Sequence, residues 1–222
     1  MIELTSVSKV YKDGDQTTKA VDDVSMKVEQ GDFVSIIGHS GSGKTTLLSL
    51  MGGLTKPDSG RVVIEGADIW SMSDDALSEF RNRNVNFIFQ FASLVPTLTV
   101  LDNVLLPTAF GPGDARVQIE YARELLSMVG LGEKMKSYPS RLSGGQQRRV
   151  AIARAFINSP RVVLADEPTG DLDEQTESEI LDIFRKQNKA GTTFIIVTHN
   201  QALAAVASRK FSMTKGVLSE IS

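Results

Sequence analysis

The sequence predicts an α/β fold with a largely parallel sheet at its centre. Short apolar runs alternate with stretches of helical periodicity along most of the chain. One apolar run leads into a glycine-rich turn, and another ends at two adjacent carboxylates. Both features suit the carboxyl edge of a parallel sheet, because open α/β proteins bind their ligands there.

Length, composition and charge limit the classes of protein to which the chain can belong. The 222 residues, 41% of them hydrophobic, can bury the core of one domain, which we expect to span 1–222. The net charge of −3 and the lack of a basic block indicate no nucleic acid partner. The absence of cysteine excludes a disulfide framework and a cysteine-based zinc site. No apolar stretch approaches the roughly 20 residues that a membrane-spanning helix needs.

The N-terminal part favours a small antiparallel sheet packed on the parallel core. Three segments rich in β-formers alternate between apolar and polar positions, namely Ile2 to Val10, Ala20 to Val28 and Arg61 to Ile64. Turn residues follow them at Asp13-Gly14, Gly31 and Gly66. Short turns of this kind join antiparallel neighbours.

Three continuous apolar runs predict the buried strands of the core. The runs are Phe33 to Ile37, Val162 to Ala165 and Thr193 to Val197. Helical periodicity predicts one helix at Thr45 to Met51, directly after the glycine-rich turn, and another at Glu174 to Asn188. The second helix joins two of the strands, as in a strand–helix–strand crossover.

The middle of the chain predicts a helical subdomain, approximately residues 92–158, inserted in the α/β core. Ala115 to Val129 and Gln146 to Ile157 have helical periodicity. Phe91 to Gly113 contains three prolines, so we expect this stretch to be loop-rich and irregular.

A phosphate-binding loop is predicted between the first core strand and the first core helix. GHSGSGKT, Gly38 to Thr45, matches the pattern G-x-x-x-x-G-K-[ST]. Gly41 and Gly43 let backbone N–H groups turn toward phosphate oxygens, and the helix start adds its positive dipole end. Lys44 supplies a charge to the β- and γ-phosphates, and the Thr45 hydroxyl is a candidate Mg²⁺ ligand. The expected nucleotide-binding residues are Gly38, His39, Ser40, Gly41, Ser42, Gly43, Lys44, Thr45 and Thr46, and no separate role is assigned to the His39 imidazole.

Two adjacent carboxylates end the apolar run VVLAD and begin the next turn. Asp166 would lie at the carboxyl edge of the sheet, where it would contact Mg²⁺ through water. Glu167 would point toward the γ-phosphate and polarise the attacking water as general base. Alone, the pair would fit a solvated acidic turn before Pro168 equally well. The phosphate-binding loop elsewhere in the chain favours the functional interpretation.

Three motifs together resemble one known family. GHSGSGKT, LSGGQ at Leu142 to Gln146 and LADEP at Leu164 to Pro168 are similar in order and spacing to those of ATP-binding cassette (ABC) subunits. The resemblance covers essentially the whole chain. It implies a P-loop NTPase (RecA-like) parallel-sheet core with a helical subdomain that carries the LSGGQ signature. It also implies ATP and Mg²⁺ as cofactors, and hydrolysis of ATP to ADP and phosphate.

The resemblance implies roles for three further residues. Tyr11 is similar to the aromatic residue that stacks on adenine, with an ordinary surface aromatic as the alternative. Gln90 resembles the glutamine that contacts Mg²⁺ and the attacking water. It alternates with three phenylalanines, so on a strand it would face away from them. His199 follows the run FIIVT and resembles the histidine that contacts the γ-phosphate, with local packing at a strand end as the alternative.

The signature turn implies a second subunit. Ser143 can cap the following helix, which offers a second helix N-terminus to phosphate. In the family such a turn contacts the γ-phosphate of the opposite subunit, so two chains, here expected to be identical, pair head to tail around two ATPs. The residues concerned are Ser143, Gly144, Gly145 and Gln146. Arg148 and Arg149, on the same helix, are interpreted as solvated or salt-bridged.

Longer stretches resemble one subgroup of the family. FRNRNVNFIFQF, LTVLDNVLLP and LADEPTGDLD are similar to ATPases of lipoprotein-release systems, macrolide and peptide exporters, and a related cell-division ATPase. The resemblance implies an integral membrane permease-type partner, export or mechanotransmission, and a cytoplasmic location peripheral to the inner face of the cell membrane. The alternative is an ATP-dependent switch that regulates a cell-envelope or cell-division complex through a membrane partner. Asp171 stands where the subgroup has asparagine, which bears on communication across the subunit boundary.

The membrane partner is expected to bind near Phe91 to Val104. Apolar side chains of this segment could form a groove for a short helix of the partner, namely Phe91, Leu94, Val95 and Leu98. Packing of the same side chains inside the helical subdomain is an equal alternative.

Other nucleotide-dependent classes fit less well. The chain between Thr45 and Leu142 lacks the sustained heptads that a DNA-repair or chromosome ATPase needs for its long coiled coil. A translation-associated ABC protein would carry two cassettes, whereas one set of motifs is present. A guanine-binding N-K-x-D motif would need aspartate where Gly191 follows Asn188-Lys189-Ala190.

Overall fold

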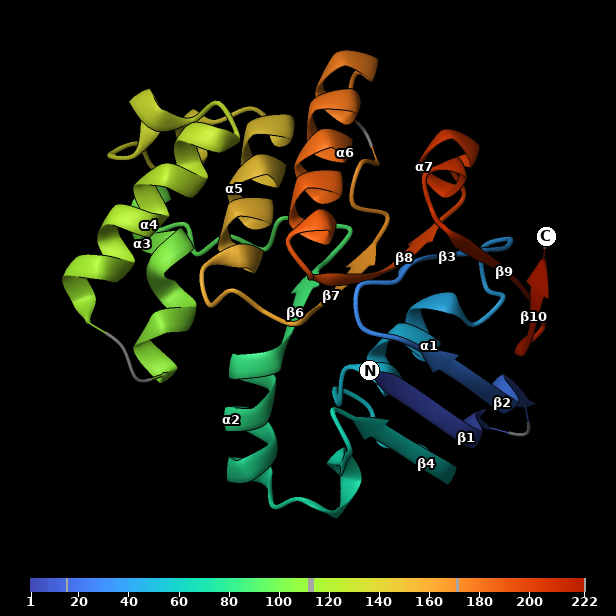
Figure 1. Ribbon diagram of the computed structural model, residues 1–222. Coiled ribbons are helices and arrows are strands. Elements are labelled where there is room, and N and C mark those ends of the chain that lie inside the picture. The colour runs from blue at the N-terminus through green and yellow to red at the C-terminus, as the bar shows by residue number, and fades with distance from the viewer. Residues whose placement is uncertain (15, 112–113, 171, 222) are drawn as a thin grey trace.

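Two sheets organise the structure, a computed structural model that describes residues 1–222 apart from 15, 112–113, 171 and 222 (Figure 1). Asp171 therefore lies outside the described residues. The larger sheet has the strand order β10-β9-β3-β8-β7-β6. Its strands are β3 (Phe33–Ile37), β6 (Val85–Ile88), β7 (Val162–Asp166), β8 (Thr193–Thr198), β9 (Arg209–Thr214) and β10 (Val217–Ile221). Neighbouring strands are parallel except β9 and β10, which confirms the predicted parallel core.

Helices cover both faces of this sheet. The α-helices of the described residues are α1 (Lys44–Met51), α2 (Asp74–Asn84), α3 (Val100–Leu105), α4 (Ala115–Met128), α5 (Gly144–Phe156), α6 (Glu174–Lys189) and α7 (Gln201–Ala205). Successive side chains of a strand point to opposite faces. Phe194 and Ile196 of β8 therefore join a hydrophobic cluster with α5 and α6, whereas Ile195 and Val197 join a second cluster with α1. Figure 1 shows α6 and α1 on opposite sides of the sheet.

The N-terminal part forms the predicted antiparallel sheet, with strand order β2-β1-β4-β5. Its strands are β1 (Ile2–Asp13), β2 (Gln16–Val28), β4 (Ser59–Ile64) and β5 (Ala67–Asp68). Asp13 pairs with Gln16, so the hairpin turns where it was predicted, although both strands run further than expected. α1 contacts β1 and β2 as well as β7 and β8, and so lies between the two sheets.

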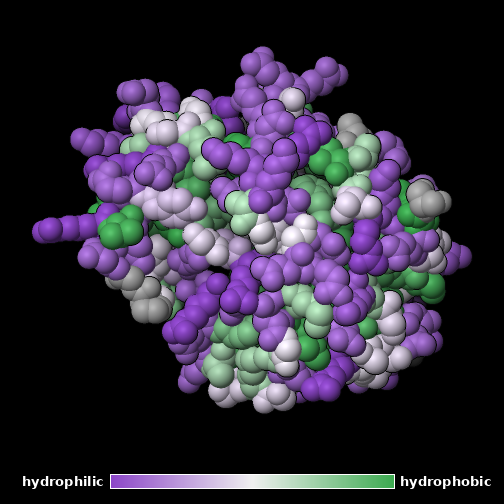
Figure 2. All heavy atoms as spheres, viewed as in Figure 1, coloured by the Kyte–Doolittle hydropathy of each residue, from purple (hydrophilic) through white to green (hydrophobic). Residues whose placement is uncertain are grey.

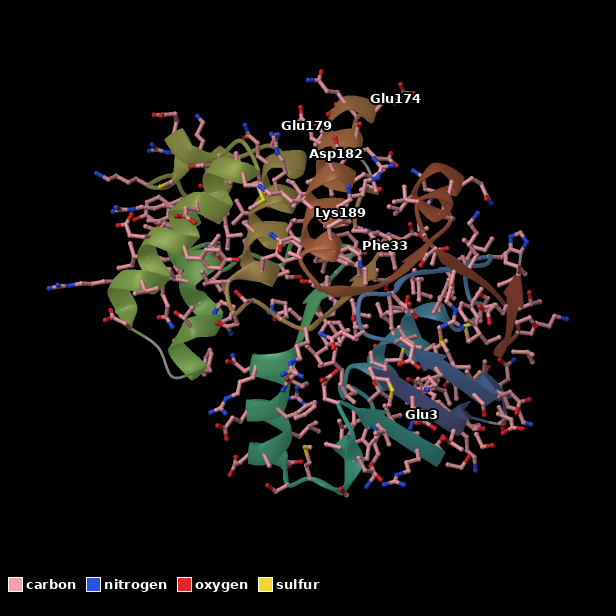
Figure 3. All side chains as sticks on the ribbon, in the orientation of Figure 1. Glu3, Phe33, Glu174, Glu179, Asp182 and Lys189 are labelled. Atoms are coloured by element: carbon pink, nitrogen blue, oxygen red, sulfur yellow. The ribbon has the colours of Figure 1, made fainter. Side chains whose placement is uncertain are left out.

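Capping residues explain where two helices near the carboxylate pair begin. Ser143 Oγ accepts from the Gln146 N–H, and the Gln146 side chain accepts from the Ser143 N–H. This capping box confirms Ser143 as the cap of α5, which begins at Gly144, two residues before the helical periodicity at Gln146. Asp173 caps α6, whose first turn is acidic and whose last turn is basic, as the helix dipole favours. Figure 3 labels exposed charged side chains along α6, namely Glu174, Glu179, Asp182 and Lys189.

Several elements were not expected from the sequence. α3 lies within the stretch that was expected to be irregular. A helix forms there because Thr99 and Asp102 make a capping box that starts it. Pro96 and Pro107 lie beyond its ends and do not interrupt it. α2, β9 and β10 lack the continuous apolar runs that identified the central strands. α3, α4 and α5 pack on one another at one end of the parallel sheet (Figure 1).

Polar residues cover most of the face seen in Figure 2, and apolar residues occur there in small groups. Within the described residues, no helix combines the length and the apolar character needed to cross a bilayer.

Candidate active site

A cleft of about 560 Å³ gathers most of the predicted site residues from distant parts of the chain. The hairpin of β1 and β2, the loop between β3 and α1, and the carboxyl ends of β6, β7 and β8 all contribute to it. Its lining is Tyr11, Thr18, Ala20, Gly38, His39, Ser40, Gly41, Gly43, Lys44, Thr45, Thr46, Gln90, Asp166, Glu167 and His199.

Two glycines of the phosphate-binding loop are required by close approach to neighbouring backbone. Gly43 has a φ of +106°, and a Cβ there would lie 1.9 Å from the carbonyl oxygen of Ala20. A Cβ on Gly38 would lie 2.3 Å from the carbonyl oxygen of Met213. The chain therefore turns tightly into α1, whose N-terminal residues line the cleft.

Lys44 carries a charge that fits phosphate, whereas Ser42, also predicted to bind the nucleotide, is not part of the cleft lining. Lys44 is buried, and its Nζ donates to the carbonyl oxygens of Gly38 (2.7 Å) and His39 (2.9 Å). The Ser42 hydroxyl is buried and has no hydrogen-bond partner among the residues described. A buried ammonium beside a helix N-terminus suits an anion with several oxygens.

Thr45 and Asp166 bring two oxygen ligands together. Thr45 Oγ1 donates a 2.7 Å hydrogen bond to Oδ2 of Asp166, which joins the start of α1 to the end of β7. Burial raises the pKa of the Asp166 carboxyl; the Thr45 hydrogen bond and Lys44 oppose this shift, and the charge of Glu167 adds to it. The pair fits Mg²⁺, which takes one or two protein oxygens and completes its coordination with phosphate and water.

Glu167 is held by the strand beside its own. It follows β7 with a φ of +46°, and its N–H donates to the carbonyl oxygen of Val197 on β8 (2.9 Å). Its Oε2 accepts from Thr198 Oγ1, and its Oε1 accepts from the His199 N–H, both at 2.9 Å. His199 Nδ1 lies 2.7 Å from Oε1, and the imidazole is exposed at the cleft rather than packed locally. The structure thus brings Glu167 and His199 together as one hydrogen-bonded unit.

Gln90 lies in a loop rather than on a strand. β6 ends at Ile88, and Gln90 is exposed at the cleft. The rings of Phe87 and Phe89 stack with centroids 5.3 Å apart, whereas Phe91 is 76% exposed. The predicted alternation of Gln90 with the three phenylalanines therefore extends only to Phe89, because the chain leaves the sheet there.

Tyr11 stands on β1 and presents an exposed ring to the cleft, with Lys9 Nζ 5.8 Å from the ring centroid. Thr18 is its partner across the hairpin, and Thr18 and Ala20 also line the cleft. Neither residue was predicted from the sequence. The hairpin register could have identified Thr18, because directly paired residues share one face of a sheet.

The signature turn lies away from the cleft of its own chain. Ser143 and Gly144 are exposed, and the part of the chain that the structure describes shows no residue from Ser143 to Gln146 in the cleft lining. A Cβ on Gly145 would lie 3.2 Å from Leu172, whereas the space around Gly144 is open. The predicted site residues therefore form two separate groups within one chain.

Arg148 was expected to be solvated or salt-bridged, and the structure shows that it is not solvated. Arg148 is 6% exposed, and its Nη1 donates to the carbonyl oxygens of Glu167 (2.9 Å) and Phe89 (3.3 Å). Arg149 agrees with the expectation, because its Nη1 lies 3.8 Å from a carboxylate oxygen of Glu179 on α6. Helical periodicity gave no reason to place Arg148 inside, since arginine is seldom fully buried.

A family model confirms what these motifs imply. The sequence model described as ABC transporter matches residues 21–170, a range that includes the phosphate-binding loop, Gln90, the signature turn and the carboxylate pair. The chain belongs to the ABC transporter family. It is an ATP-binding and ATP-hydrolysing subunit of this family.

Two kinds of relative are similar over nearly the whole chain. The lipoprotein-releasing system ATP-binding protein LolD of Shewanella oneidensis is 44% identical over 219 residues, which cover 98% of this chain and 95% of LolD. The macrolide export ATP-binding/permease protein MacB of Syntrophobacter fumaroxidans is 42% identical over 221 residues, which cover 98% of this chain and 31% of MacB. The predicted resemblance to this subgroup is confirmed.

Solved structures share the fold. A dimeric structure of MJ0796, a bacterial ABC transporter cassette, matches with a TM-score of 0.94 and 39% identity over 100% of this chain and 99% of that chain. The post-hydrolysis dimer of MJ0796 with ADP and Pi matches with a TM-score of 0.93 and 38% identity over the same shares. The predicted ABC cassette fold, with its parallel core, antiparallel sheet and helices, is confirmed.

A groove with both polar and apolar lining lies next to the segment expected to receive a membrane partner. Leu94 packs against the larger hydrophobic cluster, and Phe91 is exposed. A groove of about 770 Å³ lies between α2 and the 3-10 helix Leu106–Phe110. Its apolar lining residues are Leu54, Val85, Phe87, Ala109 and Phe110, and its polar lining comes mainly from side chains of α2.

Proposed function

We propose that two copies of this chain close head to tail around two Mg-ATP molecules and thereby drive an integral membrane partner in export or mechanotransmission. The separation of the signature turn from the cleft of its own chain carries this proposal. A capped helix N-terminus with Ser143 and Gly144 exposed is suited to contact phosphate held by another chain. The solved structures of MJ0796 are dimeric, which supports the same arrangement here.

The cleft would hold one nucleotide along its length. Adenine would stack on Tyr11, and the phosphates would lie against the loop from Gly38 to Thr46. Lys44 would exchange its carbonyl partners for β- and γ-phosphate oxygens. Thr45 and Gln90 would hold Mg²⁺ directly, and Asp166 through water. When bound, Mg²⁺ neutralises charge on the β- and γ-phosphates.

Glu167 would act as the general base of hydrolysis. Its carboxylate would accept a proton from the attacking water while the bond from the γ-phosphorus to the bridging oxygen of ADP breaks. His199, already in contact with Glu167, would orient this carboxylate and contact the γ-phosphate. The Ser143 to Gln146 turn of the opposite chain would bind the remaining γ-phosphate oxygens.

Complementation tests the shared site. The Lys44→Ala variant loses its phosphate charge, and the Ser143→Arg variant blocks its signature turn, so each alone should be nearly inactive. An equimolar mixture should recover up to about a quarter of the wild-type ATPase rate, because half of random dimers would contain one intact composite site. A mixture as inactive as its components would contradict the head-to-tail arrangement.

The names of the relatives support a membrane partner. LolD is named as part of a lipoprotein-releasing system, and MacB is named as an ATP-binding/permease protein. An integral permease-type subunit would then bind at the groove near α2 and hold this chain at the inner face of the cell membrane. The alternative, a switch that regulates a cell-envelope or cell-division complex, would use the same groove and the same ATP cycle.

The absence of cysteine allows a direct test of the groove. Phe110→Cys places one thiol in the groove, and a cysteine-directed photo-crosslinker attached there should capture an integral membrane protein in native membranes. Val217→Cys, on the edge strand β10, is the matched control because Val217 is also an exposed apolar residue. Equal capture from both positions would contradict docking at the groove. The identity of the captured protein then shows whether the partner is a permease or a component of a cell-envelope or cell-division complex.

A further inference from the structure

One buried guanidinium connects the two segments that carry the proposed catalytic groups. Arg148 lies in the second turn of α5, four residues after the exposed Gly144. Its Nη1 donates to the carbonyl oxygens of Glu167 (2.9 Å) and Phe89 (3.3 Å), and its Nη2 donates to the carbonyl oxygen of Gly170 (3.4 Å). A guanidinium offers several donors in a fixed plane, so one side chain can bind carbonyls from separate segments.

We propose that Arg148 is a positioning residue for ATP hydrolysis. It holds the peptide of Glu167 and the peptide that precedes Gln90 in a fixed relation to each other and to the signature helix α5. The inference rests on the proposed roles of Glu167 and Gln90, and it adds a residue that touches neither ATP nor the attacking water.

The backbone at Glu167 needs such support. A non-glycine residue with a φ of +46° is strained and persists only where its surroundings hold it. The Glu167 N–H is held by Val197, and its carbonyl oxygen accepts from both Arg148 and the Gly170 N–H (3.2 Å). Because the side chain leaves from this backbone, a rotated peptide would turn the carboxylate away from Thr198.

The segment around Gln90 depends on the same helix. Arg148 contacts the carbonyl oxygen of Phe89, directly before Gln90. Arg154, six residues later on α5, donates to the carbonyl oxygens of Ala92 (2.8 Å) and Ser93 (3.0 Å). Two guanidiniums of α5 thus bracket Gln90, and that of Arg148 also reaches the carbonyl oxygen of Glu167. A displacement of α5 would therefore reach both groups at once.

The test separates catalysis from nucleotide binding in the full chain. Arg148→Met keeps the length of the side chain but removes its donors. We expect it to lower kcat for Mg-ATP hydrolysis about tenfold or more, while Kd for ATP changes less than about threefold, because no contact of the phosphate-binding loop is altered. Arg148→Lys, with one compact donor group, should recover part of the lost kcat. Calorimetry of the same samples gives the folded fraction.

A merely structural role would give a different result. If Arg148→Met lowers the melting temperature but leaves kcat per folded molecule unchanged, the proposal is wrong. Arg149→Met is the matched control on the same helix, because its ion pair points to Glu179, and its kcat should stay within about twofold of wild type. If the Arg149 and Arg148 variants lose kcat equally, the effect belongs to α5 in general and the proposal also fails.

Two further variants separate this inference from the proposed function. Arg148→Met combined with Gln90→Ala should lose less activity than the product of the single losses, since both act on one segment. Fully multiplicative losses would remove the link to Gln90. Glu167→Gln is measured in parallel: full activity in that variant would overturn the general base itself. If Glu167→Gln is inactive while Arg148→Met is fully active, only the positioning role of Arg148 is overturned.

Discussion

The hydroxyl of Thr198 donates a 2.9 Å hydrogen bond to Oε2 of Glu167. Thr198 is completely buried at the end of β8, and its oxygen also accepts from the Asn200 N–H at 3.0 Å. The His199 N–H holds the other oxygen of the same carboxylate. The strand next to β7 therefore orients both oxygens of the candidate general base.

Thr198→Val should lower kcat for ATP hydrolysis about tenfold. Valine keeps the shape of threonine but removes the donor, and a hydrogen bond to a charged group contributes about 1.5–3 kcal/mol. KM for ATP should change little, because Thr198 does not belong to the cleft lining. Steady-state ATPase kinetics measure both constants. Thr198→Ser, which keeps the hydroxyl, is the control; equal kcat values for the two variants would contradict the role of this hydrogen bond.

Asp166→Asn should raise the thermal stability of the nucleotide-free protein near pH 7. Burial raises the pKa of Asp166 above its ordinary value of 3.8, so the folded chain holds this proton more tightly than the unfolded chain does. The free energy of unfolding of the wild type therefore falls as the pH rises from about 4 through the folded pKa, and an amide avoids this loss.

Calorimetry across this pH range tests the assignment. The difference in Tm between Asp166→Asn and the wild type should be present at pH 7 and shrink toward about pH 4. A difference that stays constant with pH would mean that another group is responsible. Mg-ATP hydrolysis should be strongly reduced in the same variant, because the carboxylate that faces Thr45 is lost.

Gly43→Ala should destabilise the fold by about 2–4 kcal/mol, because its Cβ would meet the carbonyl oxygen of Ala20 at 1.9 Å and its φ is +106°. Gly41→Ala is the matched control. Gly41 also has a positive φ, but no atom lies within 4 Å of its Cβ position, so only about 1–2 kcal/mol of backbone strain is expected. Urea unfolding measures both, and equal losses would show that the contact with Ala20 does not matter.

Tyr11→Ala should weaken ATP binding about tenfold, since stacking of a base on an aromatic ring contributes about 1–3 kcal/mol. Tyr11→Trp should bind ATP about as well as the wild type. Tyr138→Ala is the control, because the two tyrosines are similarly exposed (46% and 45%) and Tyr138 does not line the cleft. Titration with a fluorescent ATP analogue gives Kd. A similar loss in both alanine variants would argue against adenine stacking at Tyr11.

Local chemistry explains which parts of the site could be predicted. The residues from Gly38 to Thr45 are contiguous, and their pattern contains the turn, the charge and the hydroxyl that phosphate needs. Asp166 and Glu167 were identified by their place at the end of an apolar run. Gln90 and His199 were reached only through resemblance to a family, because no local pattern links them to the loop.

Strands and helices, like the site residues, could be predicted only where a local pattern marks them. β3, β7 and β8 were identified because burial on both faces leaves a continuous apolar run. β9 and β10 were missed, since β9 begins with Arg209 and Lys210 and β10 is an edge strand. Capping boxes at Thr99 and Ser143 set helix starts that hydrophobic periodicity alone did not locate.

Local patterns were enough to predict the α/β class, the phosphate-binding loop and the carboxylate pair, because each depends on residues that are neighbours along the chain. Which distant groups act on them depends on how the chain folds. β8 places Thr198 and His199 against Glu167, and α5 buries Arg148 between the backbone segments on either side. Strand order and helix packing bring these residues together across long stretches of chain, so no pattern within one segment could have revealed them.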